Sequence, residues 1–307
     1  MKIVDAHCDV LCKMWLDSSL SFENGEGLHT NLEKMRRAGA KLQLFAIYVP
    51  ESVPDAAKFD CALEMVDIFH EKVVKPYDEI VPVYSKKEAE SLPDGKIGAM
   101  LTLEGCDAIG REANRLKTLI RLGVRSVGLT WNYGNATADG ILEARGAGLT
   151  DFGRSVVDLH NQHRIWTDVS HLSVRAFWDV VDQGRYVMAS HSNAKAICTH
   201  PRNLDNQQLT ALIEKDAFIG VTFVPKFLRN DRNASVTDII HHIEHLCSLG
   251  GAKNIGLGSD FDGIDQVPAG LESYYDYPRL IEELLRYYNN DQVKGFLGEN
   301  LIARIPH

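Results

Sequence analysis

The sequence predicts an α/β fold of the (β/α)₈ barrel type, formed by residues 1–307 as a single domain. Three observations lead to this prediction. Eight short apolar runs rich in β-branched residues recur along the chain, most of them precede a stretch with helical periodicity, and no Pro- or Ser-rich linker divides them. An open doubly wound sheet has the same alternation, but no G-x-G-x-x-G loop follows the first run, where a dinucleotide-binding sheet would place it.

The predicted strands alternate with predicted helices in chain order. We expect strands at residues 2–6, 42–49, 97–103, 124–130, 165–169, 186–190, 217–223 and 254–258. We expect helices at residues 55–71, 113–122, 152–163, 173–183, 205–214 and 236–249, and a short helix at 85–90 that ends before Pro93. Thr150 and Ser173 are start signals, because their hydroxyls can accept the free N–H groups of a first turn. Gly123 and Gly184 follow two of the helices at positions suited to a C-terminal cap.

The composition is that of a soluble globular protein. Hydrophobic residues make up 45% of the chain and charged residues 24%, and 33 basic against 42 acidic side chains give a formal net charge of −9. This balance argues against a nucleic-acid partner, since binding to phosphates depends on clustered cations. No run reaches the roughly 18 apolar residues of a membrane helix, and the opening MKIVDAHCDV lacks the apolar core of a signal peptide. Together with six scattered cysteines, these features predict a cytoplasmic protein that does not bind a membrane.

Residues that can bind a metal follow five of the predicted strands. In a (β/α)₈ barrel the active site lies where the carboxyl ends of the strands meet. The residues at those ends are His7 and Asp9 after the first strand, Glu104 after the third, His171 after the fifth, His191 after the sixth and Asp260 after the eighth. Each is weak evidence alone, but their shared position predicts one common site.

The residue types at these positions suit divalent metal ions. His7 and Asp9 are two residues apart, so on an extended backbone both side chains point the same way. Imidazole and carboxylate ligands together suit zinc. Glu104 ends an apolar run, where it either forms a buried ion pair or binds metal. If Glu104 bridges, the set can hold two Zn²⁺ ions about 3.5–4 Å apart that share a hydroxide, which indicates hydrolysis without an organic cofactor.

Five motifs resemble those of the membrane (renal) dipeptidase family of zinc hydrolases in order and spacing. They are DAHCD, TLEG, DVSHLS, SHSNA with Arg202-Asn203 downstream, and GLGSDFDG; the closing GFLGEN is similar too, so the resemblance spans nearly the whole chain. The resemblance implies a (β/α)₈ barrel with two zinc ions, one held by His7, Asp9 and Glu104 and the other by Glu104, His171 and His191. It also implies that Arg202 contacts the substrate carboxylate and that Asp260 is the proton-transferring acid.

Side-chain chemistry is compatible with those two roles. The planar guanidinium of Arg202 matches a terminal carboxylate, although without the resemblance a surface salt bridge would be an alternative. Asp260 can accept a proton from the attacking water and donate it to the leaving amine. Asp262 is the rival for this role, but Asp260 lies nearer the strand end.

One position departs from the family pattern. The family's archetype has a histidine after its fourth strand that helps bind the scissile carbonyl oxygen, and the matching residue here is Trp131. Its indole N–H is a donor, but it cannot take the same place as an imidazole. We expect Trp131, Asn132 and Tyr133 to be substrate-binding residues, with Asn132, Tyr133 or the metals stabilising the oxyanion. The departure puts substrate preference and rate in doubt.

Other candidates for chemistry are set aside on their sequence context. His241 with His245, and His160 with His163, have helical spacing but no third ligand, so a solvated helix face is the better interpretation for both pairs. Cys106 has no base placed for it and is expected to be a buried thiol. The tyrosines of 274–277 and 287–288 suggest a C-terminal helix packed on the barrel or on a second subunit.

The sequence therefore predicts a homodimeric metal-dependent dipeptidase, with a single catalytic domain, two Zn²⁺ ions per chain and dipeptide substrates. By resemblance it also implies tolerance of a D-residue at the carboxyl end. Two alternatives stay open. One is a binuclear hydrolase of another small amide or ester, such as an N-acyl amino acid or a lactone, which the Trp131 departure favours. The other is a metal-bound barrel that acts as a non-catalytic scaffold.

Overall fold

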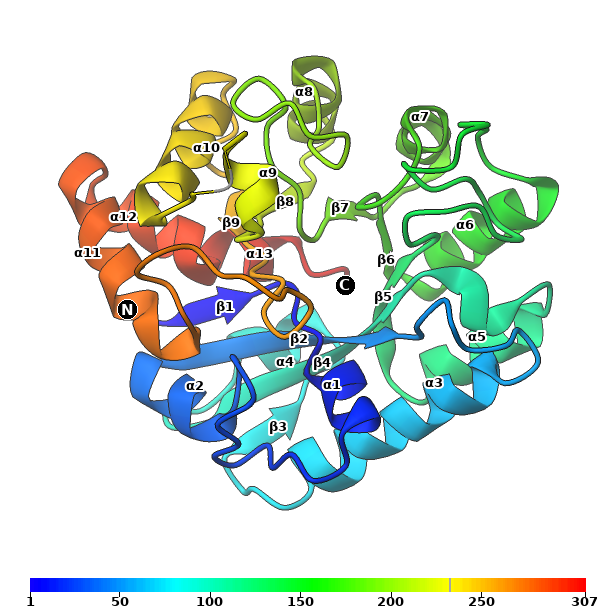
Figure 1. The fold of residues 1–307 in the computed structure, drawn as a ribbon, viewed down its shortest axis with the longest axis horizontal. Coiled ribbons are helices and arrows are strands. Elements are labelled where there is room, and N and C mark those ends of the chain that lie inside the picture. The colour runs from blue at the N-terminus through cyan, green and yellow to red at the C-terminus, as the bar shows by residue number, and fades with distance from the viewer. Residues whose placement is uncertain (232) are drawn as a thin grey trace.

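Eight parallel strands close into a barrel in the computed structural model, which describes residues 1–231 and 233–307 (Figure 1). They are β1 (Ile3–Asp5), β2 (Ala40–Tyr48), β4 (Ile97–Glu104), β5 (Val124–Gly128), β6 (Trp166–Asp168), β7 (Val187–Ala189), β8 (Phe218–Val221) and β9 (Ile255–Leu257). Their order is β2-β1-β9-β8-β7-β6-β5-β4, and pairing of β2 with β4 closes the ring. The predicted (β/α)₈ barrel is confirmed.

One further strand lies outside the ring and was not predicted. β3 (Ile80–Pro82) pairs with the first three residues of β4, next to the place where β5 takes over the same edge. It has three residues, of which only Ile80 is buried, so no period-2 pattern can be recognised in the sequence.

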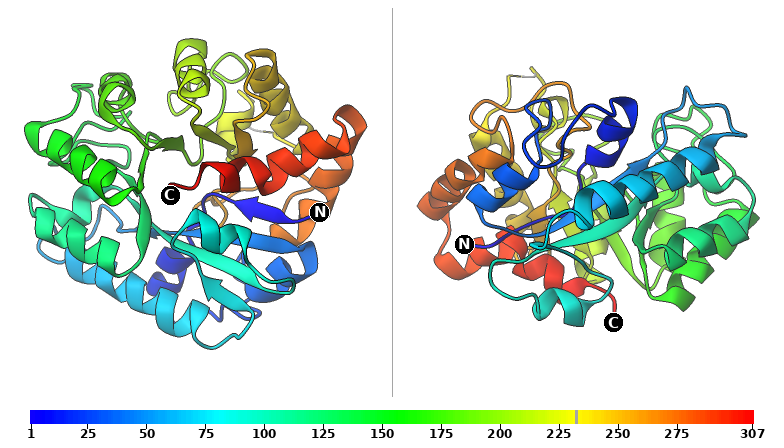
Figure 2. Two further views of the ribbon diagram at one scale, coloured as in Figure 1. Left: turned by 180° about the vertical axis from the view of Figure 1, so that it is seen from behind. Right: turned by 90° about the horizontal axis from the view of Figure 1, so that it is seen from below.

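Helices surround the barrel, as Figures 1 and 2 show. Their bounds are α1 (Val10–Leu16), α2 (Leu32–Ala38), α3 (Lys58–Asp67), α4 (Lys86–Glu90), α5 (Ala113–Arg121), α6 (Asp151–His163), α7 (Val174–Gln183), α8 (Asn206–Glu214), α9 (Pro225–Leu228), α10 (Val236–Ser248), α11 (Tyr277–Tyr287), α12 (Asn290–Lys294) and α13 (Asn300–Arg304). π-helical turns at Ile68–Val74 and Gly295–Glu299 follow α3 and α12, and 3₁₀ turns lie at Cys106–Ile109 and Tyr274–Asp276.

The predicted helix signals act largely as expected. Thr150 accepts from Gly153 N at the start of α6, and Ser173 accepts from Ala176 N at the start of α7. Gly123 has a left-handed φ of 119° after α5, whereas Gly184 ends α7 with an ordinary φ of −71°. The predicted helix at 55–71 begins later, at Lys58, and continues to Val74 through the π-helical turns.

The C-terminal segment covers the end of the barrel opposite the loops that follow the strands (Figure 2). Leu301 and Ile305 join a buried cluster whose other members include the strand residues Leu42, Met100 and Phe218. This end of the barrel is therefore filled by apolar side chains, and any site must lie at the other end.

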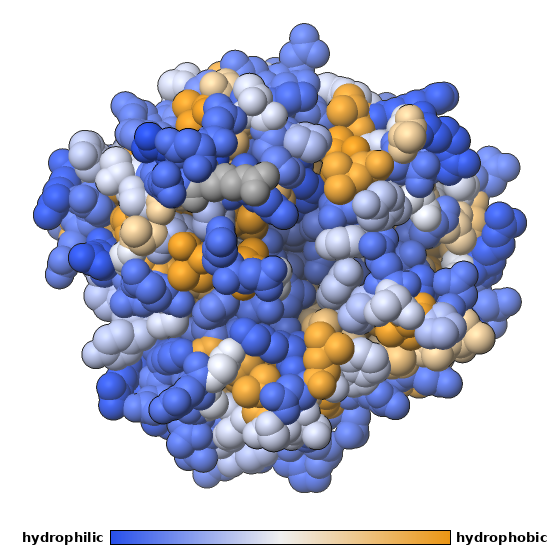
Figure 3. Space-filling model, viewed as in Figure 1, coloured by the Kyte–Doolittle hydropathy of each residue, from blue (hydrophilic) through white to orange (hydrophobic). Residues whose placement is uncertain are grey.

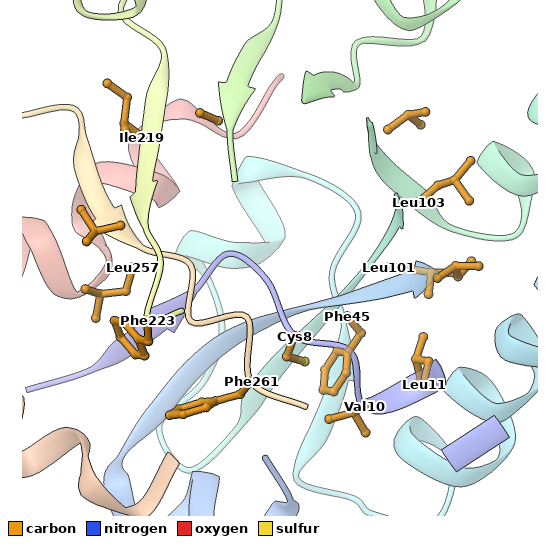
Figure 4. Close-up of a cluster of buried hydrophobic side chains, with 14 of the residues drawn as sticks. Cys8, Val10, Leu11, Phe45, Leu101, Leu103, Ile219, Phe223, Leu257 and Phe261 are labelled. Carbon is orange, nitrogen blue, oxygen red and sulfur yellow. The ribbon is translucent and has the colours of Figure 1, made fainter. Parts of the chain in front are cut away.

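The larger apolar core lies between the strands and the surrounding helices, and it reaches the loops above β1 and β9. Figure 4 shows Cys8, Phe45, Phe223 and Phe261 within it. Tyr277 is also fully buried, and its hydroxyl donates to Asp5 Oδ2 at 2.8 Å. The C-terminal aromatic segment thus packs on the barrel, one of the two arrangements that the sequence suggested. None of the helices in the described ranges is long and apolar enough to cross a membrane.

Candidate metal centre and substrate cavity

Six predicted site residues meet at the carboxyl ends of the strands. Three of them occupy defined positions at the ends of elements: Glu104 is the last residue of β4, Asp9 is the N-cap of α1, and His7 follows β1. The others, His171, His191 and Asp260, lie in the loops after β6, β7 and β9. Parallel strands in a closed ring bring their carboxyl ends to one rim, so residues up to about 250 positions apart become neighbours.

His7 lies at the centre of one half of the cluster. Its Nε2 is 3.4 Å from Asp9 Oδ2, 3.5 Å from Glu104 Oε2 and 3.8 Å from Asp260 Oδ1. Ligand atoms of His7, Asp9 and Asp260 lie within 4.8 Å of one another, as do those of His7, Glu104 and His191. Asp260 is therefore close enough to share the environment of the expected metal ligands.

The other half of the cluster surrounds Glu104 Oε1. This oxygen is 2.8 Å from His171 Nε2 and 3.6 Å from His191 Nε2, and the two Nε2 atoms are 2.8 Å apart. Glu104 thus presents one carboxylate oxygen to His7 and the other to the two remaining histidines. This is the arrangement a bridging carboxylate needs.

Neighbouring side chains fix the orientation of both of these rings. His171 Nδ1 donates to Asn132 Oδ1 at 2.9 Å, which leaves Nε2 as the unprotonated nitrogen. His191 Nδ1 donates to Ser190 Oγ at 2.7 Å, and Ser190 Oγ in turn donates to Asp168 Oδ2. The lone pairs of His171 Nε2 and His191 Nε2 are therefore both directed to the space beside Glu104 Oε1, as in a preformed metal site.

Two buried atoms of the cluster have no hydrogen-bond partner within the described residues: His7 Nε2 and Asp9 Oδ1. Unpaired polar atoms of this kind are costly in a protein interior unless a ligand satisfies them. The donor set of imidazole nitrogens and carboxylate oxygens suits zinc or a similar divalent ion. The residues present therefore fit the expected metal.

The pKa values of the three histidines are shifted in different directions. Burial disfavours the imidazolium, lowering the pKa of His171 to about 4, with Arg202 adding to the effect, and it takes the pKa of His191 well below its usual value. Burial acts on His7 in the same direction, but the adjacent carboxylates, Glu104 first, hold the pKa of His7 well above its usual value. His171 and His191 thus stay neutral and available as ligands at physiological pH.

The pKa values of Asp260 and Glu104 are also shifted in opposite directions. Burial and the nearby charges of Asp9 and Glu104 raise the pKa of Asp260 well above its usual value. Burial acts on Glu104 too, but the charge of His7 and the close contacts with His7 and His171 outweigh it and hold the pKa of Glu104 well below its usual value. The surroundings therefore favour the ionised form of Glu104 and the protonated form of Asp260.

Asp260 and Asp262 face different surroundings, although both have left-handed backbone conformations, with φ of 64° and 70°. Asp260 faces the cluster. The side chain of Asp262 is fully buried, and its oxygens accept hydrogen bonds from His29 N, Thr30 N and Lys13 Nζ. Asp262 is therefore committed to these partners, and Asp260 is the better-placed acid.

Arg202 lies beside the cluster in a buried position. Its Nη2 donates to His191 O at 3.4 Å, and its guanidinium lies 5.4 Å from the centre of the Phe227 ring. Its Nε is buried and has no hydrogen-bond partner in the described part of the chain. Burial lowers the pKa of Arg202 to about 10, so the group stays cationic. A buried guanidinium with an unused donor is suited to an anionic ligand.

A cavity of about 390 Å³ connects these groups. Its lining includes Glu104, Arg202 and Asp260, and Trp131, Asn132 and Phe227 form other parts of the wall. A second lobe of about 350 Å³ adjoins it and shares Tyr48, Glu104 and Trp131 with the first. The hollow near the centre of the face in Figure 3 is mainly hydrophilic.

The three residues expected to bind substrate occupy different places in this cavity. Trp131 lies between the lobes, with its ring 5.3 Å from the ring of Tyr48 and 6.1 Å from that of His171. Asn132 lines the first lobe but supports His171 through its Oδ1. Tyr133 is 48% exposed and lines the second lobe. Their contact with substrate stays a prediction.

Tyr48 is a site residue that the sequence reasoning missed. It ends β2 and pairs in register with Glu104 of β4, which places it on the same rim as the expected metal ligands. The signal was its position at the end of a predicted strand, the same signal that identified the histidines. Ser190 and Asp168 were missed as a pair, because their hydrogen bond joins two strands.

None of the candidates set aside from the sequence joins the groups of possible metal ligands within the described residues, although Cys106 lines the second lobe of the cavity. The sequence suggested a solvated helix face for His160, and this was wrong, because His160 is fully buried. Its Nδ1 is 2.9 Å from Thr167 Oγ1. His241 is exposed, and His245 bonds to Asn206 Oδ1 at 2.8 Å. Burial raises the pKa of Cys106, whose thiol donates to Gly128 O, so it is an unreactive buried thiol as expected.

Comparison with known proteins gives consistent matches over nearly the whole chain. A family model described as membrane dipeptidase (peptidase family M19) matches residues 1–305. An uncharacterized dipeptidase of Schizosaccharomyces pombe is 32% identical over 329 aligned positions, which cover 98% of this chain and 79% of that protein.

Two solved structures have a similar fold at low sequence identity. A metallopeptidase from Rhodobacter sphaeroides, liganded with a phosphinate mimic of the dipeptide L-Ala-D-Ala, has a TM-score of 0.93 at 25% identity over 99% of both chains. Dipeptidase AC, a metallopeptidase of family M19, has a TM-score of 0.93 at 27% identity over 99% of this chain and 98% of its own.

Proposed function

This chain belongs to the membrane dipeptidase family, peptidase family M19, and from that premise we propose that it hydrolyses the peptide bond of small dipeptides, including those with a D-residue at the carboxyl end. The observation that carries the proposal is a juxtaposition. A cluster of imidazoles and carboxylates with unsatisfied donor atoms adjoins a buried guanidinium in one cavity. A dipeptide offers the matching pair of groups, a carbonyl and a carboxylate, a few ångströms apart.

The residues of the cluster would hold two Zn²⁺ ions. We assign His7, Asp9 and Glu104 to one ion and Glu104, His171 and His191 to the other, because Glu104 presents one oxygen to each half. Bound zinc supplies Lewis acidity, which lowers the pKa of water and polarises a carbonyl oxygen. Asn132 and Ser190 would keep the ring nitrogens of His171 and His191 directed at the site.

Two side chains would act on the substrate directly. Arg202 would bind the terminal carboxylate through its unused donors and so set the position of the scissile bond. Asp260 would accept a proton from the attacking water and return it to the leaving amine. A raised pKa suits this exchange, because burial favours the protonated form that the group must reach.

The D-residue in the proposal rests on a structural relative. The Rhodobacter sphaeroides metallopeptidase is liganded with a mimic of L-Ala-D-Ala, and its fold closely matches this chain. In our proposal Arg202 recognises the carboxylate at the carboxyl end, and a carboxylate contact by itself does not select the configuration of that residue. The amino-terminal residue would then lie toward the second lobe, past Trp131 and Tyr48.

Metal content and hydrolysis of a dipeptide panel together test the proposal. The panel holds L-Xaa-L-Xaa and L-Xaa-D-Xaa dipeptides, their amidated forms and N-acyl amino acids, and it compares native protein with Glu104→Gln. We expect about two zinc ions per chain, turnover of free-carboxylate dipeptides only, and loss of both metal and turnover in the variant. Turnover of N-acyl amino acids but not dipeptides would move the function to the alternative amide substrates, and absence of metal would overturn the proposal.

Domain organisation, oligomeric state and location stay predictions. We propose that residues 1–307 form a single catalytic domain and that the enzyme is a cytoplasmic homodimer, as the sequence suggested. Sedimentation equilibrium of the purified protein measures the subunit number directly, and a monomer at micromolar concentration would contradict the dimer.

A further inference from the structure

A buried hydrogen-bonded cluster centred on Asp262 joins three separate segments next to the metal centre. Asp262 Oδ1 accepts from His29 N at 2.7 Å and from Lys13 Nζ at 3.2 Å, and Oδ2 accepts from Thr30 N at 2.9 Å. In return, Asp262 N donates to His29 Nδ1 at 3.0 Å. The carboxylate is fully buried, so water cannot replace these partners.

Each joined segment contributes to the site or supports it. Lys13 belongs to α1, the helix that Asp9 caps, and Lys13 N donates to Asp9 O at 3.1 Å. His29 and Thr30 precede α2. Asp262 itself lies two residues after Asp260, in the segment that follows β9 and approaches α1 on the open face of the barrel (Figure 1). The cluster therefore fixes the loop of Asp260 to the helix of Asp9.

The backbone of this loop is strained and closely packed. Asp260 and Asp262 both have φ in the left-handed region, a conformation that non-glycine residues keep only where their surroundings hold it. The next residue, Gly263, has no room for a side chain, because a Cβ there would lie 2.2 Å from Asp9 Oδ2 and 2.8 Å from Asp260 Oδ1. Small movements of the loop would thus displace both carboxylates.

The backbone of the loop is also bonded to the strand that carries His7. Asp260 N donates to His7 O at 3.2 Å, and Asp9 N donates to Phe261 O at 2.9 Å. These bonds hold the start of the loop. Among the contacts described above, Asp262 is the only charged residue of the loop that ties it to a segment outside the metal centre. Without that anchor, the left-handed turn would be held less firmly, by the backbone bonds at its start.

We propose that Asp262 is a positioning residue, which holds Asp260 in register with the scissile bond by clamping the loop to His29, Thr30 and Lys13. The proposal rests on the proposed function of Asp260 in proton transfer. Asp262 itself does not touch the substrate or the reacting atoms. Its contribution is to the geometry of the turn, so its loss should affect the chemical step more than substrate binding.

The test compares Asp262→Asn with the native enzyme and with Asp260→Asn. The asparagine keeps the size of the side chain, but its NH₂ group would face the backbone N–H of His29 or Thr30 and cannot accept from it. At least one hydrogen bond of the clamp is therefore lost. We expect kcat to fall about 10²-fold, as for a displacement near 1 Å, with KM changed less than about threefold and bound zinc retained. Asp179→Asn is the matched control, because Asp179 accepts from Leu149 N and pairs with Arg154 away from the site; its kcat should equal that of native protein.

A second variant and a second measurement keep the proposal testable if Asp262→Asn folds poorly. His29→Ala removes the acceptor for Asp262 N at a partly exposed residue and should lower kcat in the same way, without change in KM. Hydrogen exchange of metal-free protein should show that the amides of His29 and Thr30 lose protection in Asp262→Asn.

The outcomes separate this proposal from the proposed function. If native protein does not cleave dipeptides, the proposed function fails. If native protein cleaves them and Asp260→Asn is inactive, but Asp262→Asn retains native kcat with full zinc, Asp262 is not a positioning residue. Zinc loss that accounts for the whole fall in kcat would overturn the proposal as well.

Discussion

The Nε2 atoms of His171 and His191 lie 2.8 Å apart, although the two histidines follow different strands. Each ring uses its Nδ1–H elsewhere, His171 with Asn132 and His191 with Ser190, so each Nε2 presents a lone pair to the other and to Glu104. Facing lone pairs repel unless a cation lies between them. The fold therefore carries an electrostatic cost that a bound metal ion relieves.

Removal of metal should destabilise the folded protein measurably. A ligand that binds only the folded state adds about 2.7 kcal/mol to the free energy of unfolding at a concentration 100 times its dissociation constant. We expect the melting temperature to fall on chelation and to recover on addition of zinc. Thermal unfolding of native protein and Glu104→Gln measures this, and an equal response of the two proteins would contradict a metal centre built on Glu104.

The Ser190 hydroxyl should set metal affinity through His191. In Ser190→Ala the ring loses the acceptor for its Nδ1–H, and its orientation and tautomer are no longer fixed. Loss of such an outer-sphere partner typically lowers metal affinity about 10–100-fold, which competition with a chromophoric chelator measures. Ser192→Ala is the matched control, because the Ser192 hydroxyl contacts Ser170 Oγ at 3.4 Å and no ring nitrogen in the part of the chain that the structure describes. Equal affinity of the two variants would exclude this role.

The second lobe of the cavity should favour dipeptides with a basic amino-terminal residue. Besides Glu104, its charged lining consists of the carboxylates of Glu51, Asp55 and Asp107 and the ammonium of Lys58. Lys58 Nζ is 2.9 Å from Asp55 Oδ1 and 3.9 Å from Asp107 Oδ1, so a net negative charge remains. One added ion-pair interaction of about 1.4 kcal/mol would make kcat/KM about tenfold higher for Lys-Ala than for Glu-Ala.

Substitution and salt check the origin of that preference. Asp107→Asn should reduce the ratio of kcat/KM for Lys-Ala over Glu-Ala, and high ionic strength should do the same. Asp265→Asn is the matched control, because Asp265 lines the other lobe. A ratio near one in native protein would show that the second lobe does not select by charge.

Acid should destabilise the fold through two buried histidines outside the metal centre. Burial lowers the pKa of His160 to about 3 and that of His242 to about 4. Below the ordinary pKa of 6.5 the unfolded chain takes up a proton that the folded protein excludes, so the stabilisation present at neutral pH is lost as the pH falls toward those values. Each histidine contributes a slope of about 1.4 kcal/mol per pH unit in that window.

Urea denaturation between pH 7 and pH 5 measures this dependence. His160→Asn removes the excluded proton and can keep a contact with Thr167, so its free energy of unfolding should fall less steeply with pH than that of native protein. His70→Asn, at a more exposed position, is the control for the substitution itself. Parallel curves for all three proteins would show that His160 does not titrate on unfolding.

The sequence was sufficient for the barrel and for the common position of the candidate metal ligands. The alternation of apolar runs and helical stretches specifies parallel strands, and a closed parallel barrel forces their carboxyl ends together. His7, Glu104 and His171 could therefore be predicted to meet without knowledge of any contact. The short elements escaped this reasoning: β3 is three residues long, and α1 and α2 are seven each, too short for a clear period.

Only the tertiary structure decided what Asp262 contacts and what holds each candidate ligand in place. The sequence favoured Asp260 because it lies nearer the strand end. It gave no sign that Asp262 accepts hydrogen bonds from His29 and Thr30, which lie 233 and 232 positions earlier in the chain. The bond from Ser190 to Asp168 and the position of Tyr48 beside Glu104 likewise join different strands. Such contacts depend on the three-dimensional packing of side chains, and local periodicity contains no information about them.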